Sequence, residues 1–253
     1  MADWMREREA RLREFFGAGA GVEMIPQDEA RRFELSRETE EALARFNIEW
    51  HVVPTAGALP LDDGYFARLY PRAPRDFLKP REHAPSFRER LTAGHAKHQG
   101  RVVGVETTVK PRYLPGLRQF YGTAYGHDPS ADPFAPYMGR AAMVNGTRYA
   151  HNYTSLRAFV AVVNDDWRAR GILPAGYRAT VCPPALFNLV GAAFHPEWSE
   201  TETLELGFYR DERGNATCFA VGSAAPNDFS FIAEVEGEGE WSLMGFRVAL
   251  VPE

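Results

Sequence analysis

The chain has 253 residues, of which 45% are hydrophobic and 25% charged, and its formal net charge at pH 7 is −5. This composition is typical of a globular protein with a sizeable core. Residues 1–16 lack the continuous apolar core of a signal peptide, and no apolar run reaches the roughly 18 residues that span a bilayer. We therefore expect a soluble, cytoplasmic protein without membrane contact.

The charge is distributed unevenly along the chain. Residues 66–118 carry 12 Lys and Arg against 4 Asp and Glu, whereas residues 195–253 carry 3 against 12. Clustered cations concentrate anions, so the basic stretch could bind a phosphate, a nucleotide or a nucleic acid. The alternative is that the acidic C-terminal part folds against the basic middle and neutralises it.

The sequence contains no nucleotide-binding loop, metal signature or nucleophile motif, so it identifies no cofactor and no metal ligand set. The two cysteines, Cys182 and Cys218, each lie in an apolar run without CxxC or CxxH spacing. We expect two buried, reduced thiols.

The first half of the chain predicts short helices, one strand and a covering loop. Helices are expected over residues 2–16, 37–46 with Ser36 as N-cap, and 86–98 with a break or frayed turn at Gly94. Asn47–Val53 alternates as a half-buried strand whose polar face carries Glu49 and His51, and we interpret His51 as a surface or cross-strand residue rather than a ligand. Six prolines in residues 54–85 favour an ordered covering loop with one helical turn near 62–70. His95 and His98 could face the same way, with His83 upstream, but no cysteine and few carboxylates lie near them, so a solvated basic helix end is expected rather than a metal site.

Residues 101–153 combine charged, aromatic and glycine residues more densely than a core requires. In 101–110 the valines alternate with Glu106, Thr108 and Lys110, which predicts a strand that either lines a cleft or is exposed to solvent. The following Pro- and Gly-broken stretch carries Arg118, Tyr121, Tyr125 and His127, residue types that often line binding sites from loops.

Asn145-Gly146 predicts a two-residue hairpin turn. A core helix then begins with Thr154 as cap and ends before Gly171. His151 lies just ahead of this helix start, where backbone N–H groups could hold an anion. Downstream we expect a strand over 177–182 and a helix over 184–194. A four-stranded antiparallel meander should close the chain, with a β-bulge at Gly245 where the alternation changes phase.

This order of elements, without regular βαβ alternation, predicts an α+β fold of mixed helices and hairpins with a C-terminal antiparallel β-meander. We expect one domain over residues 1–253, with an N-terminal helical and Pro-rich covering segment over 1–99 and a main body over 100–253.

Three functions are open at this point. The favoured one is an enzyme or binder that acts on a small anionic molecule in a polar and aromatic pocket. Glu106, His127 or His151 would carry the proton, and Lys110, Arg118, Tyr121 and Tyr125 would bind the ligand. The alternatives are a non-catalytic, oligomeric interaction module and a nucleic-acid-binding protein that uses residues 66–118. The sequence does not decide whether the protein is an enzyme, nor its oligomeric state.

Overall fold

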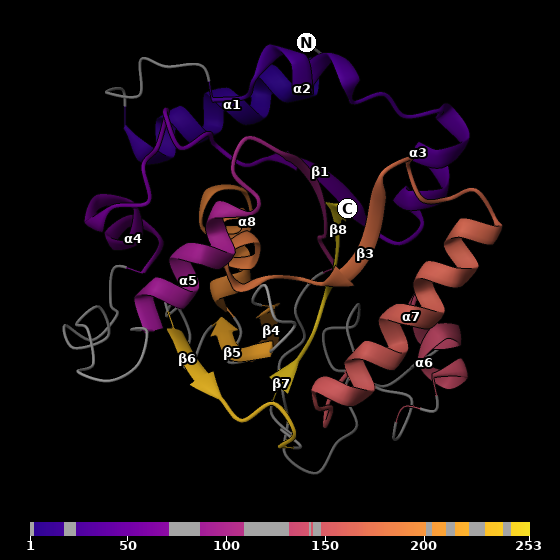
Figure 1. The fold of residues 1–253 in the computed structure, drawn as a ribbon. Helices are drawn as coiled ribbons and strands as arrows, with labels where there is room; N and C mark the ends of the chain where they lie inside the picture. The colour runs from indigo at the N-terminus through magenta and orange to yellow at the C-terminus, as the bar shows by residue number, and fades with distance from the viewer. Residues whose placement is uncertain are drawn as a thin grey trace.

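The part of the chain that the structure describes folds into two sheets and a set of helices (Figure 1). The computed structural model describes residues 3–17, 24–70, 87–108, 132–141, 143, 148–200, 204–210, 216–222, 231–239 and 244–253. The predicted α+β class is confirmed. The predicted hairpin at Asn145-Gly146 lies outside the described residues.

The first sheet has four strands in the order β1-β2-β8-β3, and every neighbouring pair is antiparallel. Its strands are β1 (Ile48–Val52), β2 (Val102–Glu106), β8 (Val248–Pro252) and β3 (Tyr177–Val181). Every residue of β2 is buried, because β2 is a central strand covered on both faces. The predicted cleft-lining or solvent-exposed face at Glu106 is therefore wrong, since alternation in sequence does not show what covers the polar face.

The second sheet has the order β6-β5-β4-β7. It contains β6 (Phe231–Val235), β5 (Ala216–Gly222), β4 (Leu204–Arg210) and the two-residue β7 (Met244–Gly245). The first three form the predicted antiparallel meander. Its fourth strand differs, because β7 pairs parallel with β4 and the chain then crosses into the first sheet as β8. The phase change at Gly245 thus marks a change of sheet rather than a bulge.

The helices pack on these sheets or between them. They are α1 (Asp3–Phe16), α2 (Gln27–Arg32), α3 (Arg37–Ala44), α4 (Asp63–Leu69), α5 (Phe87–Ala96), α6 (Ala135–Arg140), α7 (Tyr153–Ala169), α8 (Pro184–Phe194) and the 3-10 helix η4 (Pro196–Glu200). The predicted cap at Ser36 is confirmed, as its side chain accepts from the Thr39 N–H. Helix α7 is instead capped by Asn152, which forms a capping box with Ser155 and so satisfies one more backbone donor than Thr154 alone would. No helix of the described part of the chain has the length and apolar character to cross a membrane.

Helix α8 lies between the two sheets near the centre of Figure 1 and contacts β2 on one side and β4 and β5 on the other. Nine of its residues are buried, which fits its sequence, apolar except for Asn188. Cys182 and Cys218 are buried free thiols, as predicted. The core is thus continuous from one sheet to the other.

Helix α5 continues through Gly94, so the predicted break there is wrong. This glycine serves a close approach, because a Cβ at Gly94 would overlap the ring of Tyr209 in β4. Tyr209 has little room to move, since it is 7% exposed and its hydroxyl accepts from the Ala185 N–H.

We expect Gly94→Ala to destabilise the protein by about 1–3 kcal/mol through overpacking, in spite of the gain of about 1 kcal/mol in helix propensity. Urea unfolding measures this change. The control is Gly139→Ala in α6, where a Cβ meets no atom within 4 Å. Gly139→Ala should be neutral or stabilising, and a similar loss in both variants would contradict the packing argument.

Candidate functional site

The sequence-predicted site residues are only partly described by the structure. Lys110, Arg118, Tyr121, Tyr125 and His127 lie outside the described residues. Glu106 and His151 lie within them, and both are buried.

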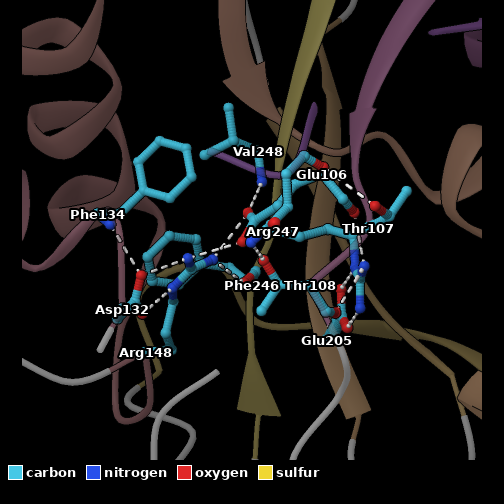
Figure 2. Close-up of polar contacts among 11 residues, drawn as sticks. Glu106, Thr107, Thr108, Asp132, Phe134, Arg148, Glu205, Phe246, Arg247 and Val248 are labelled. Carbon is cyan, nitrogen blue, oxygen red and sulfur yellow. Dashed lines mark hydrogen bonds and ion pairs between the residues drawn. The ribbon is translucent and has the colours of Figure 1, made fainter. Parts of the chain in front are cut away.

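Glu106, at the end of β2, belongs to a buried charge network (Figure 2). Its carboxylate accepts two hydrogen bonds from the Arg148 guanidinium, at 2.9 and 2.8 Å, and a third from the Val248 N–H at 2.9 Å. Arg148 also donates to both oxygens of Asp132, at 2.6 and 2.7 Å, and all three side chains are fully buried. Burial opposes the charged form of Arg148, but the carboxylates of Asp132 and Glu106 outweigh it and hold its pKa well above the ordinary value.

A second buried arginine, Arg247, adjoins this network. It donates two hydrogen bonds of 2.8 Å to Glu205 in β4 and one of 2.6 Å to the Glu106 carbonyl oxygen. Its guanidinium lies 3.7 Å from the ring centroid of Trp198. Arg247 stands between β7 and β8, so its contacts fix the point at which the chain crosses from one sheet to the other.

These contacts fit a structural role for Glu106 better than proton transfer, because its carboxylate already accepts three hydrogen bonds and is fully buried. Sequence reasoning did not select Arg148, Arg247, Asp132 or Glu205. Arg247 had a signal, since it interrupts the apolar run 246–251, where a lone charge needs a buried partner.

His151, just ahead of α7, is the second described residue of the predicted site. Its ring packs against Phe246, with ring centroids 5.8 Å apart. The Arg148 guanidinium lies 5.2 Å from the centroid of the Phe246 ring. The structure thus brings His151 and Glu106 to one buried region around Phe246. This region is packed, and His151 is only 2% exposed to solvent.

An open pocket lies elsewhere, where α7, the end of α5 and the edge strand β3 meet β4. Its cavity is about 270 Å³. Polar and charged groups dominate one part of its lining, namely Lys97, His98, Arg157, Asn164, Arg178 and Thr180, and the rest consists of Val160, Ala161, Pro183, Phe208, Tyr209 and Val251. Three cations and no carboxylate are among these lining residues.

The walls of this pocket are held in place by hydrogen bonds. Asn164 of α7 donates to the Ala179 carbonyl at 2.9 Å and accepts from the Ala179 N–H at 2.8 Å, so its amide satisfies the open edge of β3. Because this clamp fixes α7 against β3, the positions of Arg157 and Arg178 on either side of the pocket are set by rigid elements.

The predicted solvated helix end at His95 and His98 is wrong, because both side chains are substantially covered. Burial, together with the positive charges of Arg178 and Lys97, lowers the pKa of His98 to about 4. His98 is therefore neutral at pH 7, and its pKa reflects the positive potential in the pocket.

Comparisons with protein-family models, with curated proteins and with solved structures give no match to this chain.

The basic stretch 66–118 is described only in part, since residues 71–86 and 109–118 lie outside the described residues. Two of its arginines form ion pairs, Arg90 with Glu234 of β6 and Arg101 with Glu29 of α2. The pair with Glu234 is one contact of the kind expected if the acidic C-terminal part folds against the basic middle and neutralises it.

Proposed function

We propose that this protein binds a small anionic molecule in the pocket between α5, α7, β3 and β4. The observation that carries the proposal is the convergence of Lys97, Arg157 and Arg178 on one cavity, in whose lining the described residues include no carboxylate. Such a cavity attracts anions, and an arginine can hold a phosphate or a carboxylate through two parallel hydrogen bonds.

The size and the remaining lining restrict the ligand. A cavity of about 270 Å³ is at the small end for organic ligands, so one phosphate or carboxylate with a short apolar part fits it better than a large cofactor. Val160 and Phe208 provide the apolar contact, and the Thr180 hydroxyl offers a further donor or acceptor. These groups support the binding of a ligand. The basic composition of residues 66–118 also favours an anionic ligand.

Titration calorimetry of the full chain with inorganic phosphate, pyrophosphate and citrate at low ionic strength tests the proposal. At least one of these anions should bind, and added salt should weaken the binding because the pocket is open to solvent. Arg157→Gln and Arg178→Gln should each weaken it about tenfold, the effect expected when one charge-assisted hydrogen bond is lost.

Arg168→Gln is the matched control. Arg168 also lies on α7, but it pairs with Glu253 at 2.7 Å and does not line the pocket, so this variant should bind as the unmodified protein does. Bound anion should also raise the pKa of His98 above about 4, which NMR of the imidazole measures at the site itself. If none of the three anions binds, or if Arg168→Gln weakens binding as much as Arg178→Gln, the proposal is wrong.

A further inference from the structure

Edge strand β1 carries Glu49 and His51 on the face opposite to Ile48, Trp50 and Val52. Helix α1 packs on β1 and on α8, so this second face is covered rather than exposed. His51 is accordingly 1% exposed, which corrects its interpretation as a surface residue.

His195, directly after α8, completes a cluster with these two side chains. One ligand atom from each of Glu49, His51 and His195 lies within 4.8 Å of the others. His195 Nε2 is 3.2 Å from one Glu49 oxygen, and His51 Nε2 is 3.9 Å from the other.

The histidine nitrogens that face this cluster are not used in hydrogen bonds. Neither ring nitrogen of His51 nor Nε2 of His195 has a hydrogen-bond partner among the described residues. A buried polar side chain without a partner is costly, and it is uncommon unless it binds something.

From this geometry we propose that Glu49, His51 and His195 form a binding site for a divalent transition-metal ion, with Zn²⁺ the best fit. Two imidazoles and one carboxylate are a common zinc ligand set, and a water molecule would take the fourth position. The ion would join β1 to the end of α8.

The surroundings of His195 fit this role. Its Nδ1 lies 2.8 Å from Glu197, and its ring stacks on Trp198 with centroids 4.9 Å apart. A carboxylate on the far nitrogen of a metal-binding histidine fixes its tautomer and its orientation, and here it directs the Nε2 lone pair toward Glu49 and His51. Ligand atoms around tetrahedral zinc are about 3.4 Å apart, so the cluster needs only small rotations of the side chains to close around an ion.

Arg8 of α1 is the group that an incoming cation must displace. It forms an ion pair with Glu49, and its guanidinium lies 5.1 Å from the ring centroid of Phe194. Arg8 and Phe194 also line a surface hollow of about 370 Å³ beside the cluster. Movement of the Arg8 side chain into this hollow would open a path for the ion and free the Glu49 carboxylate.

The test uses the full chain, stripped of metal with a chelator. Calorimetry with Zn²⁺ should show one ion bound per chain at this site, and Co²⁺ should give the visible absorption of a four-coordinate complex with nitrogen and oxygen ligands. Zinc at 100 times its Kd should raise the Tm by roughly 5–10 °C. Glu197→Gln should weaken zinc binding by roughly 10–100-fold, and Glu49→Gln and His195→Gln by at least as much.

Two further variants make the result specific. Arg8→Gln should tighten zinc binding by about tenfold, because it removes the competing positive charge. His98→Gln removes a histidine outside the cluster and should leave zinc affinity unchanged. The absence of Zn²⁺ and Co²⁺ binding would overturn the site, as would an affinity that Glu49→Gln and His195→Gln leave unchanged or that Arg8→Gln fails to tighten.

Discussion

Arg148→Ala should lower the free energy of unfolding by about 3–5 kcal/mol, which is the range for breaking a buried ion pair from one side. Arg148 is fully buried between Glu106 and Asp132, so its removal leaves two carboxylates without their cation in the core. It also removes the hydrogen bond of 3.1 Å to the Phe246 carbonyl oxygen. Urea unfolding followed by circular dichroism measures the loss.

The surface pair of Arg168 and Glu253 provides the comparison. Both of its side chains are 51% exposed, so Arg168→Ala should cost less than about 1 kcal/mol. The triple variant Arg148→Ala, Glu106→Gln, Asp132→Asn should recover part of the stability that Arg148→Ala loses, because it leaves no uncompensated buried charge. Equal effects of Arg148→Ala and Arg168→Ala would show that the buried network does not stabilise the fold.

Acidification from pH 7 to pH 5 should destabilise the protein, and His95 and His98 together should account for about 3–4 kcal/mol of the loss. Burial lowers the pKa of His95 to about 3, with a contribution from His98, whose own pKa is lowered to about 4. Below their unfolded value of about 6.5 the unfolded chain binds protons that the folded protein does not. Stability is therefore complete above that value and is lost as the pH falls toward 4.

Unfolding in urea at pH 7, 6 and 5 measures this dependence. Most carboxylates titrate below this window, so the histidines dominate it. His98→Gln should reduce the difference between pH 7 and pH 5 by about 1–2 kcal/mol, since its share of the proton uptake disappears. Stability that is constant from pH 7 to pH 5 would contradict the burial of these two imidazoles.

Local sequence predicted most of the regular elements because the signals act within a few residues. The type of side chain at Ser36 and the acidic first turn after it predicted the cap of α3, and the structure has this cap. The apolar spacing of residues 156–167 predicted the buried face of α7. The alternation of 204–235 likewise predicted three antiparallel strands. These patterns reflect backbone geometry and hydrogen bonding between near neighbours.

The candidate sites depended on partners that are distant in the chain. Glu106 meets Arg148 and Arg247, 42 and 141 residues away. Arg157 and Arg178 share a cavity with Lys97, although only Lys97 lies in the basic stretch 66–118. No local pattern contains this information.

The sequence by itself determined the α+β class, the buried thiols and the bounds of the main helices and strands, because hydrophobic periodicity and capping are local properties. Only the tertiary structure decided which polar side chains are enclosed and which line a cavity. The polar faces at His51 and Glu106 have the same alternation as solvent-exposed strands. They are buried because α1 covers β1 and because Arg148 and the Val248 N–H enclose the Glu106 carboxylate.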